Sequence, residues 1–453
     1  MRTKEPSIQV PRNMAGYGLR SEELQDSTKK FTLDRKLLVV SSWAPPMAGG
    51  PQNLYNLFSQ FSADSYCILT SYDAIQNSSS FGRWLAGEYF FYDRAGTIEK
   101  PQASALPSRG KTPPETGKTW IKRATRLPPI VKRPLSAVYQ TAYLLLSIAM
   151  IVRMGVRVVR HRKIESIMGV SDTGPALIST YLIARCTGLP YVLYLFDIYL
   201  GNKLPPIHDL LARVLEPLMF RNASFVIVTN EGTERFYRKR YAGAVRCAVI
   251  HNSVFPKTYE PRNIPYQPKE PYSMVFTGQV YWAQERSLLN FLRAMKDFEV
   301  PVHVDLYVPI APEALKRFVS DCANVRLTAA PQSEMPGVQC GATILFLPLS
   351  WHTGRPEVIA TATPGKLADY LASGRPILIH APPYAYVNEY ARQEGFALIV
   401  DEENIQKLQD SVKKLTVDVQ YSRELIENAK RTLRKNHDVA VNARKLANLL
   451  DSL

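Results

Sequence analysis

The stretch "KLLVVSSWAPPMAGGPQNL" (residues 36–54) begins as an apolar strand and changes character within a few residues. Two glycines, Gly49 and Gly50, precede Pro51, and an amphipathic helical pattern follows. Because proline suits the first position of a helix, the pattern predicts a strand–loop–helix unit. The glycine loop is open to three interpretations: a phosphate cradle, a loop beside a substrate, or a plain tight turn. It lacks the Gly-Lys-Ser/Thr ending of a P-loop and the GxGxxG spacing of a dinucleotide site.

Strand-like and helix-like runs continue to alternate on the C-terminal side of this unit. The strand-like runs are near-continuous apolar segments, as in parallel sheets that are covered on both faces. The predicted strands are 36–42, 65–71, 164–171, 191–197, 225–230 and 247–253 in a first series, and 272–279, 302–309, 324–330, 342–350, 375–381 and 396–400 in a second. The two series predict an α/β protein with two Rossmann-like, doubly wound domains whose ligands lie in the cleft between them.

Shifts in composition predict the boundaries between the parts. Residues 1–34 form a polar tail without the apolar segment of a secretory signal. Residues 255–271 contain five prolines and no periodicity, which is typical of an interdomain linker. The predicted parts are a tail (1–34), an N-terminal domain (35–254) with a polar, basic insertion (about 81–133), a linker (255–271), a C-terminal domain (272–430) and a C-terminal helix packing back toward the N-terminal domain (431–453).

The positive charge is unusually large and unevenly distributed. The formal net charge is +16 over 453 residues. Between Lys100 and Lys163 there are fourteen lysines and arginines against one acidic residue, Glu115. Such a block attracts a polyanion, either nucleic acid or an anionic membrane surface. Because few aromatic residues lie among these cations, base-stacking platforms are scarce, and the pattern favours the membrane over nucleic acid.

The segment 135–152, "LSAVYQTAYLLLSIAMIV", carries no charge and has an arginine on each side. Its length is at the lower limit for a membrane-spanning helix. The polar residues within it favour a buried helix or one that lies on a membrane, although a span remains open. The five cysteines form no CxxC pair, so the sequence predicts no zinc site or disulfide framework and fits a reducing compartment.

The run "TATPGKLADYLASGRPILI" (361–379) is the best candidate for a ligand site. Thr363 is predicted to cap a helix of about 11 residues that starts at Pro364 and ends before Gly374. Lys366 then lies in the first turn, where the helix dipole disfavours a cation unless an external anion is bound. Asp369 and Tyr370 share its face of the helix. The alternative is a surface lysine that pairs with Asp369.

This run resembles the "P-x-K-x-x-[DE]-Y-[LM]-A-x-G-[KR]-P" segment of glycosyltransferase family four, particularly its members that build bacterial surface polysaccharides. Four further stretches are similar to the family's motifs and follow in its order. They are "WAPPMAGGPQNL", "LPYVLYLFDIY", "VTNEGTERFYRKRYAGAVRCAVIHNSV" and "MVFTGQVYWAQERSLLNFLRAM". The resemblance covers roughly residues 36–450 and implies the GT-B fold.

Two departures from the family pattern bear on the site. The family often has two glutamates separated by seven residues; Asp369 matches the second, but Thr361 stands in place of the first, and Glu357 lies too early to replace it. Where the family often has a Gly-Arg/Lys pair, Gly278 is followed by Gln279. The nearest cation is then Arg286, so the resemblance assigns the diphosphate of a sugar nucleotide to Arg286 and Lys366.

The resemblance implies a retaining, metal-independent transfer of a sugar from a nucleotide-diphosphate-sugar, with no bound cofactor. Its expected catalytic residues are Asp197, Asp369 and Lys366. Asp197 would orient or deprotonate the acceptor, unless it only caps the next helix, and His251 is expected to be packed rather than a base. The donor is expected at Gly49, Gly50, Gly278, Arg286, Arg355, Thr363, Pro364, Gly365, Lys366, Asp369 and Tyr370, with His352 as a second sugar contact and the nucleobase near 328–334.

The expected acceptor is a lipid-linked or glycan precursor of surface polysaccharide at the cytoplasmic face of the membrane, where the protein would be peripherally bound. Two alternatives stay open. One is a catalytically silent GT-B subunit that scaffolds a partner, which the missing first glutamate favours. The other is an epimerase that acts on a UDP-sugar and needs no acceptor.

Overall fold

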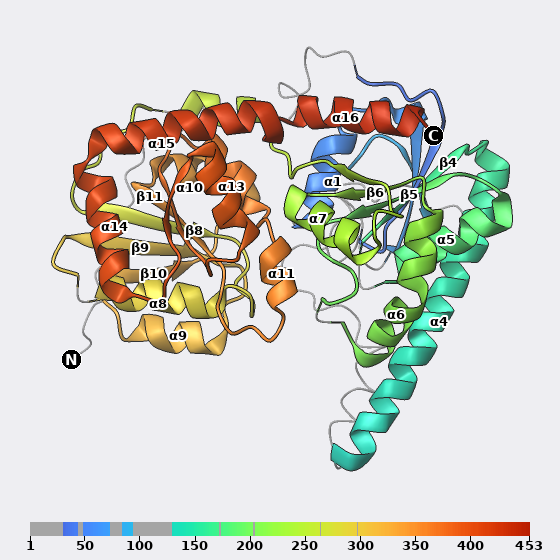
Figure 1. Cartoon of the computed structure of the whole chain (residues 1–453), viewed down its shortest axis with the longest axis horizontal. Helices are drawn as coiled ribbons and strands as arrows, with labels where there is room; N and C mark the ends of the chain where they lie inside the picture. The colour runs from blue at the N-terminus through green and yellow to red at the C-terminus, as the bar shows by residue number, and fades with distance from the viewer. Residues whose placement is uncertain are drawn as a thin grey trace, which may run out of the picture. The chain divides into compact units, whose positions relative to one another are not determined.

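The computed structural model describes residues 30–43, 49–72, 84–93, 129–171, 174–202, 204–262, 264–296 and 298–453, with side chains of the helix at 129–162 described from Gln140 onward. Phe31–Leu453 form one compact unit. Most of the predicted polar tail and most of the basic insertion lie outside the described residues. The unit contains two parallel sheets, each with helices on both faces, as the sequence predicts (Figure 1).

The first sheet has seven parallel strands in the order β3-β2-β1-β4-β5-β6-β7. Their bounds are Leu37–Val40 (β1), Tyr66–Thr70 (β2), Glu88–Phe91 (β3), Ser166–Val170 (β4), Tyr191–Leu195 (β5), Phe225–Val228 (β6) and Cys247–Val249 (β7). The helices are Gly50–Phe58 (α1), Ala63–Ser65 (η2), Pro129–Arg162 (α4), Pro175–Thr187 (α5), Pro206–Asn222 (α6) and Glu231–Arg240 (α7). Its central strands are buried throughout, as expected for apolar runs covered on both faces.

The second sheet has six parallel strands in the order β10-β9-β8-β11-β12-β13. Their bounds are Tyr272–Thr277 (β8), Val302–Tyr307 (β9), Val325–Thr328 (β10), Ile344–Pro348 (β11), Ile377–His380 (β12) and Ala397–Val400 (β13). The helices are Pro256–Thr258 (η4), Glu260–Arg262 (η5), Glu285–Lys296 (α8), Glu313–Ser320 (α9), Gln332–Glu334 (η6), Met335–Gly341 (α10), Pro356–Thr361 (α11), Lys366–Ala372 (α12), Tyr386–Glu394 (α13), Ile405–Val417 (α14) and Val419–Thr432 (α15).

A π-helical turn, Leu433–His437 (η7), and the helix Val439–Asp451 (α16) follow α15. Four residues of α16, Ala443, Leu446, Ala447 and Leu450, are buried in the core formed by β1, β2 and α1. The backbone N–H of Asp34 also donates to the Asp451 carboxylate, at 2.9 Å. The last helix of the chain therefore belongs structurally to the first sheet.

The predicted polar, basic insertion at about 81–133 includes a strand that is absent from the predicted strands. It contains β3, "EYFF", which pairs with β2 at the edge of the first sheet. The strand has only four residues and alternates between buried and more exposed positions. Since an edge strand needs no continuous apolar run, its signal is hidden among the surrounding polar residues.

The helix α4 extends well beyond the apolar stretch 135–152. By length and hydropathy, Gln140–Arg162 could cross a membrane. However, Leu144, Ile148 and Ile151 are buried in the core that covers the first sheet. At Gly155 a β-carbon would lie 2.3 Å from the side chain of Ile183 in α5, so the two helices are in close contact. A transmembrane position would remove these side chains from the core, so one face of α4 serves as a core helix.

Candidate active site

The strand orders place a topological switch point in each sheet, between β1 and β4 and between β8 and β11. In open α/β sheets, ligands bind at such points, outside the C-terminal ends of the strands. The loop with Gly49 and Gly50 leaves the C-terminal end of β1, and Gly278 follows that of β8. Two glycine turns therefore occupy the two positions where this architecture binds ligands.

Gly278 and Lys366 are neighbours although 88 positions separate them. Gly278 has a φ of 106°, in the region that favours glycine. A β-carbon at Gly278 would lie 3.4 Å from Cε and 3.5 Å from Nζ of Lys366. The backbone N–H of Gly278 donates to the Tyr307 carbonyl, at 2.9 Å, which holds the turn against β9. The turn after β8 and the start of α12 thus form one site.

The ammonium group of Lys366 has no acidic partner within 4.0 Å among the described residues. It lies 3.7 Å from the centroid of the Phe276 ring, a cation–π contact, and 3.4 Å from Oε1 of Gln284. Burial lowers the pKa of Lys366 well below its usual value, and the negative charge of Asp369 only partly opposes this. An amine held without a counter-ion is well suited to receive an anion from solution.

Asp369 lies one helical turn after Lys366 and is held by a residue that the sequence did not single out. The hydroxyl of Tyr259, in the linker between the domains, lies 2.9 Å from both Asp369 Oδ1 and Gln339 Oε1. Burial raises the pKa of Asp369 to about 6, although Tyr259 and Lys366 stabilise its charged form. A single tyrosine in a proline-rich linker carries no sequence signal for this role.

Tyr370 has a structural position rather than a ligand-facing one, which corrects its expected contact with the donor. Its side chain is fully buried. Its hydroxyl accepts a hydrogen bond from the backbone N–H of Thr277, at 3.0 Å. Tyr370 therefore positions the end of β8, just before Gly278.

The helix α12 begins later than predicted, at Lys366, and has seven residues. Gly365 is its N-cap, and no side chain caps it. Thr363 is not the cap, because its hydroxyl is buried without a partner and its carbonyl accepts from Asn252 Nδ2 in the first domain, at 3.3 Å. Gly374 has a φ of 69° directly after the C-cap Ser373, as the sequence predicts. Pro364 lies before the helix, and its carbonyl accepts from Leu367 N, at 2.9 Å.

Arg286, the predicted second cation of the diphosphate site, is paired with Glu403. Its Nε and Nη2 donate to the two carboxylate oxygens of Glu403, at 2.5 and 3.1 Å. His352, which has a φ of 53°, places Nε2 3.4 Å from the same carboxylate. Arg355 lies at the start of α11, and its guanidinium has no ion-pair partner among the described residues. A role of Arg286 at a diphosphate would require Glu403 to release it.

Asp197 lies just beyond the C-terminal end of β5 and is exposed. It does not cap α6, because that helix starts at Pro206 with Pro205 as its N-cap. Its carboxylate has no hydrogen-bond partner among the described residues. The side chain of Tyr281, in the loop after β8, lies near enough to Asp197 for the two to interact electrostatically.

Glycine is required for a different physical reason at each of the two positions after β1, Gly49 and Gly50. Gly49 has a φ of 82°, and a β-carbon there would meet nothing within 4 Å. At Gly50 a β-carbon would lie 2.2 Å from the Phe196 ring, so this glycine allows α1 to pack against the end of β5. The close approach at Gly50 is thus made by Phe196, and substitution would disturb folding as well as any ligand. Residues 44–48 of the loop lie outside the described residues.

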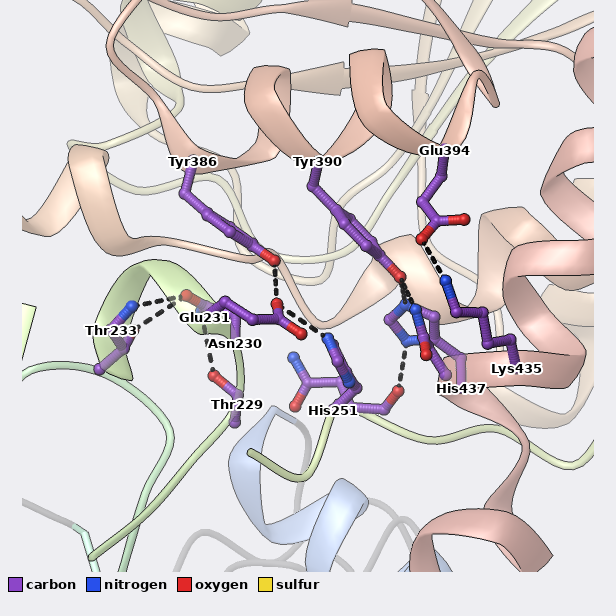
Figure 2. Close-up of polar contacts among 12 residues, drawn as sticks. Thr229, Asn230, Glu231, Thr233, His251, Tyr386, Tyr390, Glu394, Lys435 and His437 are labelled. Atoms are coloured by element: carbon purple, nitrogen blue, oxygen red, sulfur yellow. Dashed lines mark hydrogen bonds and ion pairs between the residues drawn. The ribbon is translucent and has the colours of Figure 1, made fainter. Parts of the chain in front are cut away.

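A polar cluster joins α7 of the first domain to α13 and η7 (Figure 2). Oε2 of Glu231 accepts hydrogen bonds from Tyr386 and from His251 Nε2, the latter at 3.3 Å. Nδ1 of His437 lies 2.7 Å from the Asn252 carbonyl, and Nε2 lies 3.0 Å from the Tyr390 hydroxyl. Since a carbonyl only accepts, His437 carries its proton on Nδ1 and accepts at Nε2. His251 is buried within this cluster.

The position of the family's first glutamate belongs to the same contact between the domains. Thr361 is 6% exposed. Its carbonyl accepts from Asn230 Nδ2, at 2.9 Å, and from the Thr233 hydroxyl, at 3.1 Å. Its own hydroxyl donates to the Glu357 carbonyl within α11, at 2.8 Å. Thr361 therefore serves the interdomain contact in this structure.

Within the described part of the chain, no group of three or more His, Cys, Asp or Glu side chains could hold a metal ion.

No protein-family model matches the chain, and no curated protein sequence is similar to it. Solved structures do resemble it. HepE of Anabaena in complex with UDP-glucose superposes with a TM-score of 0.62 at 13% identity, over 92% of this chain and 100% of that one. The sucrose-phosphate synthase of Thermosynechococcus elongatus gives 0.64 at 11% identity, over 92% and 98%.

An α,α-trehalose-phosphate synthase of Burkholderia xenovorans, solved with glucose-6-phosphate, gives a TM-score of 0.60 at 10% identity, over 92% of this chain and 100% of that one. The likeness extends over both domains of each structure. The chain therefore has the GT-B fold, as its sequence motifs predict. At these identities the likeness shows the fold alone.

Proposed function

We propose that the protein is a glycosyltransferase that moves a sugar from a nucleotide-diphosphate-sugar to an acceptor hydroxyl. The observation that carries this proposal is the ammonium group of Lys366, which lies at the Gly278 turn without an acidic partner among the described residues. The turn is at the switch point of the second sheet, where ligands of this architecture bind. The GT-B fold and the sequence motifs around Lys366 support the same interpretation.

Departure of the nucleoside diphosphate leaves negative charge on its β-phosphate. The ammonium of Lys366, already in place beside Gly278, would stabilise this charge as it develops. Phe276 and Gln284 hold the ammonium group in position before the substrate arrives. Asp369, fixed by Tyr259, would accept hydrogen bonds from hydroxyl groups of the sugar or ribose. The transfer is proposed to be retaining and independent of metal, following the family resemblance.

Asp197 is the proposed partner of the acceptor hydroxyl. Its exposed carboxylate faces no competing donor among the described residues. The acceptor is proposed to be a lipid-linked or glycan precursor in surface-polysaccharide synthesis at the cytoplasmic face of the membrane, which the basic composition of residues 100–163 supports.

Donor binding tests the proposal directly. A panel of UDP-, GDP- and dTDP-sugars is added to the purified protein, and the melting temperature is measured, since a ligand that binds only the folded state raises it. At least one donor should stabilise the wild-type protein, and Lys366→Ala should abolish that shift. Lys413→Ala, an exposed lysine on α14, is the matched control. If no donor binds the wild type or is turned over, the proposal is wrong, and a silent scaffold subunit becomes the better interpretation.

The scaffold alternative is favoured by one specific observation: the first-glutamate position is Thr361, which has no carboxylate and whose hydroxyl donates to the Glu357 carbonyl within α11. An active transferase must then hold the donor sugar with other groups. Release of free sugar or transfer to any acceptor would exclude the scaffold. Conversion of a UDP-sugar to its epimer without an acceptor would instead identify the epimerase alternative.

A further inference from the structure

Exposed apolar side chains are concentrated on two neighbouring helices of the first domain. Six of the thirteen large hydrophobic side chains that are exposed among the described residues belong to α4 and α6. They are Tyr143, Leu145 and Leu146 on α4 and Leu210, Val214 and Leu218 on α6, each 48–63% exposed. The two helices contact each other and run side by side (Figure 1). A clustered apolar surface of this kind marks an interaction site rather than the scattered exposure of an ordinary surface.

The exposed face of α4 changes from apolar to basic along one stripe. Residues at spacings of three and four share a helix face. The exposed residues at these spacings are Ala142, Leu146, Ala149, Arg153, Arg157 and Arg160. None of the three arginines has an acidic partner among the described residues. On α6 the exposed stripe Leu210, Val214 and Leu218 likewise leads to an exposed arginine, Arg221. From Ala142 onward on α4, and on α6 apart from the ion pair of Asp209 with Arg213, the exposed stripe changes from apolar to basic.

The two apolar halves lie level with each other and with the active-site edge of the sheet. The strand β4 begins four residues after α4 ends, and β6 begins three residues after α6 ends. Both helices therefore end at the edge where strands start, and their earlier halves lie toward the edge where strands finish. At 1.5 Å per residue, Leu146 is about 24 Å and Leu210 about 18 Å from the ends of their helices. A five-residue strand spans about 17 Å, so both leucines reach the edge that carries Asp197.

We propose that the α4–α6 surface inserts into an anionic lipid leaflet. The surface is defined by Tyr143, Leu145, Leu146, Leu210, Val214 and Leu218. Its choice of partner rests on the proposed function, in which the acceptor is lipid-linked. Arg153 lies about 10 Å along α4 from Leu146. When Leu146 sits below the headgroups, at the depth of about 5–10 Å typical of interfacial helices, Arg153 lies at the level of the lipid phosphates.

Charge favours lipid over the other possible occupants. A second copy of this surface carries the same positive charge, so it offers the unpaired arginines no complementary charge. An anionic leaflet instead supplies phosphate to the arginines and hydrocarbon to the leucines. Insertion at the edge of the sheet that carries Asp197 also delivers a membrane-embedded acceptor to the proposed active site. The buried face of α4 stays in the protein core, so the helix lies at the membrane without crossing it.

Vesicle binding of the full-length protein tests the surface. Vesicles of phosphatidylcholine with and without phosphatidylglycerol are sedimented with the protein. The variant Leu146→Glu/Leu210→Glu should bind at least tenfold less to the anionic vesicles. Its control is Ile310→Glu/Val417→Glu, which changes two even more exposed apolar residues of the second domain and should bind like the wild type. Thermal melts confirm that all variants are folded.

The arginines are tested separately. Arg153→Gln/Arg157→Gln/Arg160→Gln should weaken binding about fivefold for each arginine, since one basic residue near an anionic leaflet contributes roughly 1 kcal/mol. Its control with the same loss of charge is Arg317→Gln/Lys413→Gln/Arg434→Gln in the C-terminal region. High salt should remove the arginine contribution but leave that of the leucines. The proposal is overturned if the leucine variant binds as the wild type does, or if the surface instead mediates self-association that Leu210→Glu abolishes.

The two proposals can fail independently. Donor-dependent thermal stabilisation should be unchanged in the leucine and arginine variants, because these residues lie outside the donor site. If the surface variants bind vesicles as well as the wild type does, and the protein still binds a donor, only the docking surface is overturned. Vesicle binding that depends on it, in a protein that binds no donor, overturns only the proposed function.

Discussion

The interdomain cluster of Figure 2 and the Lys366 site both contain partly buried ionisable groups, but these groups differ in their hydrogen-bond and ion-pair partners. In the cluster, Glu231 receives two hydrogen bonds, and both nitrogens of His437 are bonded. At the Lys366 site, the ammonium has an amide oxygen and an aromatic ring beside it but no carboxylate. The pKa values of the two groups reflect these surroundings. Burial opposes the charge of Glu231, but its hydrogen bonds outweigh that effect and lower its pKa to about 2. At Lys366, burial is the larger effect and lowers the pKa of the amine.

This difference in partners distinguishes the cluster, which holds the domains together, from the Lys366 site, which is the proposed ligand site. Groups that satisfy one another stabilise the contact between the domains and leave nothing for a ligand. A desolvated cation without a counter-ion costs stability in the free protein, and that cost is recovered only when an anion binds. If this contrast is correct, removing charge should weaken the cluster and strengthen the ligand-free Lys366 site. The following four substitutions test it.

Lys366→Met should have the largest effect, on activity. Losing a preorganised charge at the leaving group should lower the rate of transfer about 100-fold or more. The ligand-free protein should melt at the same or a higher temperature, because the buried amine is gone. The pKa of Lys366 is lower in the folded than in the unfolded protein. At pH values between these two pKa values, the unfolded wild type binds more protons than the folded one, so wild-type stability rises with pH in that range. Thermal melts from pH 6 to 10 should show this slope in the wild type and not in the variant; a lower melting temperature at neutral pH would contradict the contrast.

Tyr390→Phe should destabilise the cluster. The variant leaves Nε2 of His437 and the side chain of Asn436 without their partner. Leaving buried polar groups unpaired typically costs about 1–3 kcal/mol. Urea unfolding measures the loss, and Tyr384→Phe, at a tyrosine that is 48% exposed, is the control that should change little. Equal stabilities of the two variants would show that the hydroxyl of Tyr390 does not stabilise the contact.

Asp369→Asn should stabilise the ligand-free protein near neutral pH. Because the folded pKa of about 6 exceeds the unfolded value of 3.8, the folded state binds more protons, and wild-type stability falls as pH rises through that window. The asparagine lacks this loss and can still accept from Tyr259. We expect a gain of about 1–2 kcal/mol at pH 7 that disappears near pH 4, measured by urea unfolding at both pH values. Transfer should fall, since the carboxylate is proposed to bind the donor.

Glu231→Gln should have the smallest effect and the opposite sign. The folded pKa of about 2 lies below the ordinary value of 4.5, so the charge of Glu231 stabilises the fold above pH 4.5 and that stability is lost as the pH falls. Its side chain is 41% exposed, and solvent screening reduces the contribution to about 1 kcal/mol. Urea unfolding should show the variant weaker at pH 7 and equal to the wild type at pH 2. A variant that is more stable at pH 7 would place Glu231 with Lys366 rather than with the cluster.

The architecture was accessible from sequence because buried parallel strands are apolar along their whole length. The predicted strands fail where burial has another cause. The run 247–253 reads as one strand, yet β7 ends at Val249, because His251 and Asn252 are buried by the contact between the domains. The opposite error occurs at the edge strand β3, which exists but was not predicted, because only part of it is buried.

The site was accessible only where its residues are close in the chain. Lys366 and Asp369 share one helix turn, and their proximity follows from spacing alone. The neighbour Gly278, the anchor Tyr259 and the ion pair of Arg286 with Glu403 depend on contacts between distant segments. Thr363 illustrates the same limit: it has the composition of an N-cap, but its backbone is used by Asn252 of the other domain. Rules for helix capping consider only residues close in sequence, so they do not anticipate this contact with Asn252.

The position of α16 has a consequence for the order in which the protein is made. Its apolar residues complete the core around α1 and β1, but the ribosome adds them about 190 residues after β7. At roughly 5–20 residues per second, the first sheet waits about 10–40 s with that face of α1 uncovered. Nascent chains stalled before Val439 should therefore be cleaved near α1 by protease, and release of the complete chain should protect them. The earliest part of the protein to be synthesised is thus among the last to finish folding.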